Sequence, residues 1–193
     1  MLPSKWFAAA GTAAAVALLM APTAQAVTTR EAVAPTGVSA VTTLHYDASR
    51  APGWEAAVAA GVASWNSNAR NVRLVPAQSG TRAEIQIVAT SGWPQATLGP
   101  VRPGGQARVE LGNQAVTEGH DRTRIAAHEI GHTLGLPDTK PGPCSQLMSG
   151  SSAGTSCKNA VPDATERARV DSAYAGRTAA PAPADGRVLV DAS

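Results

Sequence analysis

The chain has 193 residues, of which 16 are Lys or Arg and 14 are Asp or Glu, so its formal net charge is +2. Because the basic residues are dispersed and form no runs, the composition argues against a nucleic-acid or membrane-surface partner. The length suits one domain with its own core. Aromatic residues make up only 4% of the chain, so this core must be built mainly from aliphatic side chains.

The first residues have the features of a secretory signal peptide. Lys5 supplies a positive charge, residues 6–20 form an alanine-rich apolar run, and residues 24–26 form a small-residue cleavage site. The run is shorter than the roughly 20 residues that span a bilayer, so no membrane anchor is expected. We predict that residues 1–26 are a signal peptide, that residues 27–41 are the short pro-segment of a zymogen, and that the protein is secreted.

Hydrophobic periodicity divides the rest of the chain into strands and helices. Apolar residues recur at the spacing of one helix face after Pro52, and they alternate with polar residues in several other stretches. The expected elements, in chain order, are a strand over 43–47, a helix opened by Pro52, strands near 72–74, 83–87 and 108–111, a loop over 91–105, a helix over 125–136 and a closing helix over 162–175.

The order of these elements predicts an α+β domain over residues 42–176, in which helices cover a small, mixed and twisted sheet. Residues 109–111 are the candidate edge strand of this sheet, and we expect a cleft beside them. Residues 177–193 are rich in alanine and proline. We expect them to be a flexible tail, apart from a short apolar stretch at 188–190.

The most informative stretch is His-Glu-Ile-Gly-His at residues 128–132. On a helix, His128 and His132 project from the same face, where their imidazoles can share one zinc ion. Glu129 lies beside this pair, where it can take a proton from a water molecule at the metal and pass it to a leaving amine. A bare match of this kind also arises by chance on charged helices, so the flanking residues decide its meaning.

A catalytic zinc ion needs three protein ligands and one open position, so a third ligand is required. Gly135 permits the positive φ that ends a helix, Pro137 cannot continue the helix, and the chain then folds back at Asp138. We predict that Asp138 completes the ligand set. Taken alone, an aspartate after a proline is also an ordinary turn residue.

The chain has two cysteines, Cys144 and Cys157. Both are predicted to be extracellular, so they should form a disulfide. A zinc-binding role for them is disfavoured, because histidine and carboxylate ligands suffice and thiols oxidise outside the cell. A bridge over a loop of this size contributes roughly 3 kcal/mol to stability.

The extended motif HExxHxxGxxD, followed by a methionine turn around Met148, resembles the snapalysin family of small secreted neutral metalloproteases of bacteria. These proteases are similar to metzincins, with aspartate in place of the third histidine. The resemblance covers roughly residues 42–176. It implies a metzincin-like zinc protease domain with a zinc-binding helix, a Met-turn and a C-terminal helix, in which His128, His132 and Asp138 bind zinc and Glu129 is the general base.

The resemblance also has implications for substrates and for a second metal. Protein and peptide substrates of a monomeric enzyme are expected to lie antiparallel to the edge strand, with an aromatic residue favoured just after the scissile bond. Asp121 and Thr123 match positions that would supply oxygens to a calcium ion. From the sequence alone, Asp121 is equally well interpreted as the N-cap of the zinc-binding helix.

One position departs from the family, whose members usually carry a tyrosine two residues after the ligand aspartate. That tyrosine can donate a hydrogen bond to the oxyanion, and this chain has Lys140 in its place. The Lys140 ammonium group either stabilises the developing charge or points to solvent. The sequence therefore predicts a secreted zinc-dependent endopeptidase; the alternative is a secreted zinc-binding, metzincin-like protein with weak or no proteolytic activity.

Overall fold

A single sheet organises the part of the chain that the computed structural model describes, residues 40–176 and 187–191. Its strands lie in the spatial order β2-β1-β3-β5-β4-β6. Neighbours among β2, β1, β3 and β5 are parallel, whereas β4 runs antiparallel to both β5 and β6. The strands are β1 (Thr42–Arg50), β2 (Val72–Pro76), β3 (Ile85–Thr90), β4 (Gln95–Thr97), β5 (Ala107–Gly112) and β6 (Val188–Val190).

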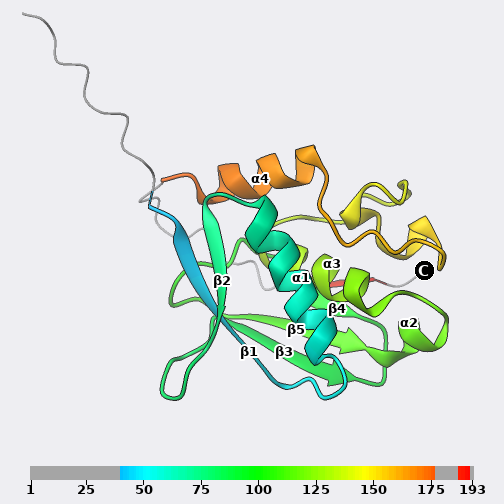
Figure 1. Cartoon of the computed structure of the whole chain (residues 1–193), viewed down its shortest axis with the longest axis horizontal. Coiled ribbons are helices and arrows are strands. Elements are labelled where there is room, and N and C mark those ends of the chain that lie inside the picture. Colours follow the sequence, from blue (N-terminus) through cyan, green and yellow to red (C-terminus); the bar gives the residue numbers. More distant parts are fainter. Residues whose placement is uncertain (1–39, 177–186, 192–193) are drawn as a thin grey trace, which may run out of the picture. The chain divides into compact units, whose positions relative to one another are not determined.

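Helices pack against one face of this sheet (Figure 1). They are α1 (Glu55–Asn68), α2 (Asn113–Thr117), α3 (Arg122–Thr133) and α4 (Ala164–Tyr174), and a short 3-10 helix η1 (Leu147–Ala153) precedes α4. Helix α1 connects the parallel strands β1 and β2, which need such a crossover because a tight hairpin cannot join parallel neighbours.

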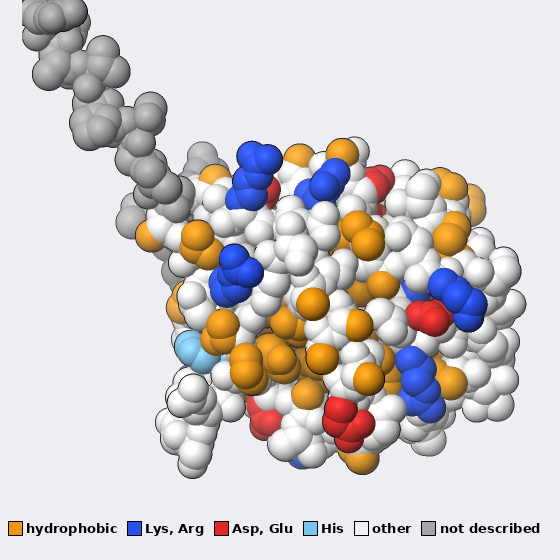
Figure 2. Space-filling model, in the orientation of Figure 1, with side chains coloured by type: hydrophobic (Ala, Val, Ile, Leu, Met, Phe, Trp, Pro, Cys, Tyr) orange, Lys and Arg blue, Asp and Glu red, His pale blue; other side chains and the backbone are white. Residues whose placement is uncertain are grey.

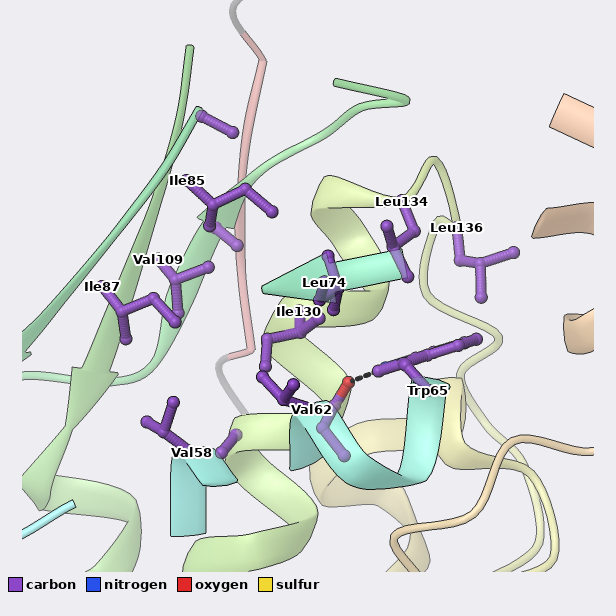
Figure 3. Close-up of a cluster of buried hydrophobic side chains, with 14 of the residues drawn as sticks. Val58, Val62, Trp65, Leu74, Ile85, Ile87, Val109, Ile130, Leu134 and Leu136 are labelled. Atoms are coloured by element: carbon purple, nitrogen blue, oxygen red, sulfur yellow. Dashed lines mark hydrogen bonds between the residues drawn. The ribbon is translucent and has the colours of Figure 1, made fainter. Parts of the chain in front are cut away.

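The hydrophobic core lies between the sheet and the helices α1 and α3. In Figure 3, Ile87 and Val109 from the sheet point toward Val58 and Ile130 from the helices. Along β5 the buried Ala107, Val109 and Leu111 alternate with the more exposed Arg108 and Glu110. This alternation is expected for a sheet that is covered on one side only. Figure 2 shows side chains of both charges dispersed over one face of the molecule.

Helices α1 and α3 approach each other closely at Gly61. A Cβ atom at this position would lie 2.9 Å from the backbone nitrogen of Ala127, so only glycine fits without a backbone shift. One turn later, the indole Nε1 of Trp65 donates a hydrogen bond of 2.8 Å to the Ala127 carbonyl oxygen (Figure 3). This contact fixes the position of α3, the helix that carries the histidine motif.

The strands and helices expected from periodicity are present, and the α+β fold class is confirmed, with two corrections. Residues 109–111 are not an edge, because β5 pairs with β3 on one side and with β4 on the other. The loop expected over 91–105 contains β4, which has only three residues and is too short for alternation to reveal it. The short helix α2 was also not expected.

Part of the predicted C-terminal tail is ordered against the sheet. Residues 188–190 form β6, which pairs with β4. The predicted signal peptide, almost all of the predicted pro-segment and residues 177–186 lie outside the described residues. Within residues 40–176 and 187–191, no helix has the length and apolar character needed to cross a membrane.

Replacing Gly61 with alanine tests the close contact between α1 and α3. Alanine is normally about 1 kcal/mol more favourable than glycine within a helix. We expect Gly61→Ala instead to lower the free energy of unfolding by about 1–3 kcal/mol, because its methyl group overlaps the backbone of α3. Denaturant unfolding measures this change.

Gly92→Ala is the matched control for this substitution, because a Cβ atom at Gly92 would meet nothing within 4 Å. We expect it to change the free energy of unfolding by no more than about 0.5 kcal/mol. A stabilising effect of Gly61→Ala would contradict the close approach of the two helices.

Candidate metal centre

Helix α3 places the histidine motif inside the protein. Its start is capped by the Asp121 carboxylate, which accepts a hydrogen bond of 2.9 Å from the backbone N–H of Arg124. His128, Glu129 and His132 are at most 1% exposed. Charged or polar groups this deeply buried need compensating partners, so their arrangement indicates what they bind.

The chain reverses direction after α3 and returns with Asp138. Gly135 has a φ of 100°, as expected for the glycine that ends a helix. Oδ1 of Asp138 then lies 3.3 Å from Nε2 of His128 and 3.6 Å from Nε2 of His132. Tetrahedral zinc with bonds of about 2.0–2.2 Å holds its ligand atoms about 3.3–3.6 Å apart, so both separations from Asp138 match those of ligands that share one ion.

Both imidazole rings are held by their other nitrogen. Nδ1 of His128 lies 3.0 Å from the carbonyl oxygen of Leu147, and Nδ1 of His132 lies 2.7 Å from that of Leu136. A carbonyl oxygen can only accept, so each Nδ1 carries the proton and donates it. The lone pair of each neutral ring is then on Nε2, the atom that faces Asp138.

The atoms that converge at this site lack hydrogen-bond partners. Seven buried side-chain nitrogen or oxygen atoms have no partner among the described residues, and five of them belong to this cluster: Nε2 of His128 and His132, Oδ1 of Asp138 and both carboxylate oxygens of Glu129. Each such atom costs about 1–3 kcal/mol when it stays unsatisfied. Two imidazoles and a carboxylate are zinc ligands, so the residues present fit this ion.

Charge interactions within the cluster shift its protonation equilibria in the absence of a cation. Burial lowers the pKa of His128, but the Asp138 and Glu129 carboxylates outweigh it and raise that pKa to about 9. Burial and the charge of His128 lower the pKa of His132 to about 4. Burial raises the pKa of Glu129 to about 8. The carboxylates beside the two buried imidazoles therefore favour a positive charge at this place, which a metal ion can supply.

A methionine turn lies beneath the histidine helix, as the motif predicted. Met148 is fully buried, and a Cβ atom at Gly131 would lie 2.7 Å from its sulfur, so the glycine lets the methionine side chain pack directly against the helix. The Met148 carbonyl oxygen accepts a hydrogen bond of 2.8 Å from the backbone N–H of Thr139. The turn therefore contacts both the helix and the segment that carries Asp138.

Two buried charged residues that the sequence did not single out hold this turn. The Arg124 guanidinium donates to the carbonyl oxygen of Gln146 and to the hydroxyl of Ser149. The Glu166 carboxylate accepts from the backbone N–H groups of Leu147 and Met148, at 3.1 and 2.7 Å. Each looks like an ordinary helix charge in the sequence, because the groups that they bind lie far along the chain.

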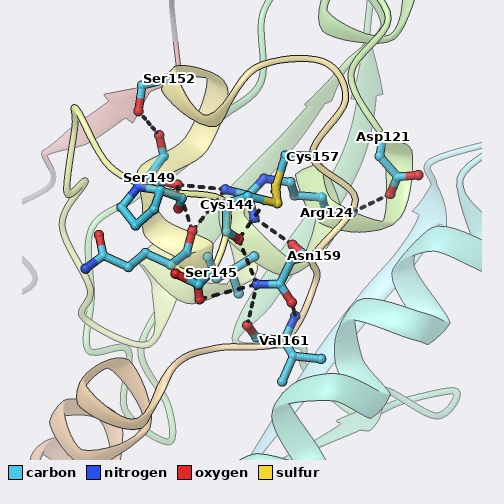
Figure 4. The surroundings of a disulfide bond; sticks show 12 residues. Asp121, Arg124, Cys144, Ser145, Ser149, Ser152, Cys157, Asn159 and Val161 are labelled. Atoms are coloured by element: carbon cyan, nitrogen blue, oxygen red, sulfur yellow. Dashed lines mark hydrogen bonds between the residues drawn. A yellow bond between two sulfur atoms is a disulfide. The ribbon is translucent and has the colours of Figure 1, made fainter.

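The predicted disulfide between Cys144 and Cys157 is confirmed, and it closes the loop that contains the methionine turn (Figure 4). Asn159, two residues beyond the second cysteine, donates from its side chain to the Cys144 carbonyl oxygen and accepts from Arg124 at its own carbonyl oxygen. The bridge and Arg124 therefore fix the same loop.

Lys140 and Asp191 meet at the edge of the cluster. The Lys140 ammonium group forms an ion pair with the Asp191 carboxylate, and the lysine side chain is only 23% exposed. Ligand atoms of His128, Asp138 and Asp191 lie within 4.8 Å of one another. Lys140 therefore faces the site and not the solvent, and Asp191 is a site residue that the sequence did not identify.

A small pocket opens beside His128. Its lining residues come from α2, from α3 and the two residues before it, from the residues that follow Met148, and from the residue after β6. They include Ala115, Ile125, His128, Gly150, Ser151 and Asp191.

Comparison with known proteins assigns the chain to a family. Residues 40–176 match the model of the Streptomyces extracellular neutral proteinase (M7) family. The chain belongs to this family. The resemblance to snapalysin inferred from the motif is thereby confirmed, and the protein is a zinc metalloendopeptidase.

Two M7 relatives are extracellular small neutral proteases of Streptomyces. The one from Streptomyces coelicolor is 40% identical over 78% of this chain and 67% of the relative. The one from Streptomyces caespitosus is 38% identical over 69% of this chain and 97% of the relative. The chain therefore spans about two thirds of the length of the first relative and nearly all of the second.

Among solved structures, the archaemetzincin from Methanopyrus kandleri is similar in part. It is 14% identical, and the similarity covers 72% of this chain and 98% of that one with a TM-score of 0.45.

The calcium site implied for this M7 chain finds no support in the structure. The Asp121 carboxylate serves as the N-cap of α3, the alternative interpretation of this residue. Within the described residues, the groups of three or more His, Cys, Asp or Glu side chains that are close enough to share a metal all contain His128, and Asp121 belongs to none of them.

Metal binding by this M7 chain should depend on His128. Zinc at about 100 times its dissociation constant should raise the free energy of unfolding by about 2.7 kcal/mol. We expect His128→Ala to lose most of this increment, measured by denaturant unfolding with zinc and with a chelator.

His45→Ala is the matched control, because His45 lies on β1 and pairs with Glu84, away from the cluster. It should keep the full zinc-dependent increment whatever its effect on basal stability. An equal increment in His128→Ala and wild type would contradict the assignment of the ligand.

Proposed function

We propose that this protein is a secreted endopeptidase that hydrolyses peptide bonds in extracellular proteins with one zinc ion held by His128, His132 and Asp138. The observation that carries the proposal is the convergence of buried ligand atoms without protein partners. Zinc, when bound, would acidify a water molecule and polarise the carbonyl group of the scissile bond.

Glu129 is the general base of the proposed reaction. Its side chain is fully buried beside the two histidines, and neither of its carboxylate oxygens has a hydrogen-bond partner. A carboxylate in this state is available to a proton of the attacking water. Glu129 takes this proton and returns it to the amine that leaves when the peptide bond breaks.

Lys140 takes the place of the tyrosine that M7 relatives are expected to carry. Its ammonium group lies beside the ligand cluster, where it pairs with Asp191. A cation there can stabilise the negative charge that develops on the carbonyl oxygen of the substrate. We assign this oxyanion-stabilising role to Lys140.

The substrate main chain is proposed to lie along β4 and not along residues 109–111. The segment that leaves β4 is joined to the end of α3, because Gly99 N–H donates to the His132 carbonyl oxygen and Val101 N–H donates to that of Thr133. A peptide that took the place of β6, antiparallel to the outer side of β4, would therefore pass the proposed metal ligands. For the substrate residue just after the scissile bond we propose an aromatic side chain.

Secretion is proposed to involve the two N-terminal segments. Residues 1–26 would direct export and be removed after Ala26, and residues 27–41 would be a pro-segment. The extracellular neutral proteases of Streptomyces support this assignment. N-terminal sequencing of the mature protein from the culture medium measures the end of the pro-segment, and sequencing of the secreted precursor measures the end of the signal peptide.

Removing the Glu129 carboxylate should abolish catalysis without removing the metal. Loss of a positioned general base typically costs a factor of about 100–10,000, so we expect Glu129→Gln to lower casein hydrolysis by at least about 100-fold. Its zinc content should equal that of wild type, because the ligands are unchanged. Casein hydrolysis with chelator and with restored zinc, together with metal analysis, measures both effects.

Glu118→Gln is the matched control, since Glu118 is exposed beyond the end of α2. It should hydrolyse casein at the wild-type rate. Full activity of Glu129→Gln would contradict the mechanism, and an inactive wild type would favour the zinc-binding protein without proteolytic activity.

Neutralising Lys140 should slow the chemical step. Loss of one oxyanion donor typically costs about 100–1,000-fold in kcat, so we expect a reduction of this order in Lys140→Met. Lys140→Tyr, which restores the residue expected from the family, should recover most of the rate. Steady-state kinetics on a peptide substrate measures both.

The control for the Lys140 variants is Lys158→Met, which removes the same charge from an exposed residue. Equal kcat values for Lys140→Met and Lys158→Met would show that Lys140 has no role in the reaction.

A further inference from the structure

Strand β6 lies on the outer side of β4, where the proposed substrate would bind. Thr97 pairs with Val188, Ala96 with Leu189 and Gln95 with Val190, all antiparallel. The main-chain pairing continues beyond the strand at both ends: Leu98 N–H donates to the Arg187 carbonyl oxygen and Asp191 N–H donates to that of Pro94. An extended peptide substrate would need the same groups of β4.

The residue after β6 lies beside two of the proposed metal ligands. Asp191 is 5% exposed, and its carboxylate lies within 4.8 Å of ligand atoms of His128 and Asp138. It also lines the small pocket beside His128. A carboxylate oxygen is a zinc ligand, so a group placed here competes for the open position that catalysis requires.

The surrounding residues are arranged to receive the Asp191 carboxylate. Lys140 pairs with it, and both the backbone N–H and the hydroxyl of Ser151 donate to it, at 3.3 and 3.4 Å. A Cβ atom at Gly150 would collide with the carboxylate, so the absence of a side chain there leaves the space that Asp191 fills. These contacts involve the very lysine that we assign to oxyanion stabilisation.

We propose that residues 187–191 are an intramolecular inhibitor of this protease: β6 occupies the substrate-binding side of β4, and the Asp191 carboxylate would compete with the catalytic water for a metal held by His128, His132 and Asp138. The inhibitory role of this segment rests on the proposed function, whereas its docking on β4 does not. The segment lies outside residues 40–176, the part of the chain that matches the family.

The way in which β6 is held makes the inhibition reversible. Val188 and Val190 are 52% and 48% exposed, so the strand gains little from apolar burial. Main-chain hydrogen bonds and the contacts of Asp191 hold it in place, and each contributes a modest net free energy. Because the segment is tethered to the domain, its effective concentration is high enough to compete with free substrate.

Docking of the segment is tested by amide hydrogen exchange in the full-length protein, without metal and with zinc. The Leu98 and Asp191 amides should be protected in wild type, because both donate across the β4–β6 pair. Leu189→Pro removes an amide from the centre of the strand and should make both exchange rapidly. This readout does not depend on catalysis.

Inhibition is tested by the kinetics of the same proteins on a peptide substrate. If the segment is docked in at least nine of ten molecules, its release should raise kcat/KM roughly tenfold or more. We expect this increase in Leu189→Pro and in Asp191→Asn, which removes the charge and keeps the shape of the side chain. Asp185→Asn, which removes the same charge from another position in the C-terminal segment, is the matched control and should leave kcat/KM unchanged.

The outcomes separate the inhibitory role from the proposed function. Equal kcat/KM for wild type, Asp191→Asn and Leu189→Pro would overturn the proposal, as would exchange of the Leu98 amide that is equally rapid in wild type and Leu189→Pro. If kcat/KM rose as much in Asp185→Asn as in Asp191→Asn, the inhibitory role assigned to the Asp191 carboxylate would be overturned. Protection of the amides without peptidase activity in any variant would count against the proposed function, and so against inhibition, while establishing the docking.

Discussion

Two hydrogen bonds from imidazole Nδ1 atoms to backbone carbonyl oxygens are the constraint on which the site depends. Neither acceptor lies in α3: Leu147 belongs to the methionine turn, and Leu136 to the segment after the helix. The Nε2 atoms therefore converge only when these segments are in place. The Glu166 carboxylate, which also completes the capping box at the start of α4, holds the turn by its backbone N–H groups. The C-terminal helix thus contributes to a site that it does not line.

Local patterns predicted the features that depend on residues close in the chain. His128 and His132 share a helix face because their spacing matches the helical period, and Gly135 ends that helix because its positive φ suits glycine. The edge of the sheet could not be predicted in this way. Strand order depends on pairings between distant segments, and β4 is too short to show a period of two. Residues 109–111 were therefore assigned to an edge although they lie inside the sheet.

The surroundings of the metal position were predictable only in part. Lys140 was identified as unusual, but whether it faced the site or the solvent depends on a partner about fifty residues further along the chain. The apolar stretch before Asp191 is visible in the sequence, yet nothing local indicates that it pairs with β4. Arg124 and Glu166 resemble solvent-exposed helix charges for the same reason. Buried ionic groups with distant partners are the features that a one-dimensional pattern does not reveal.

The borders of the sheet have a further consequence for a protein expected to act outside the cell. An open strand edge can pair with the edge of another copy, which leads to association and aggregation. The border at β2 carries the exposed Arg73 and ends at Pro76, and the border at β6 is only three residues long. Both are poor templates for pairing with a second chain. If β6 is released as proposed, the main-chain groups of β4 become available to other copies of the chain as well as to a substrate, so the release that exposes the proposed substrate site also favours aggregation.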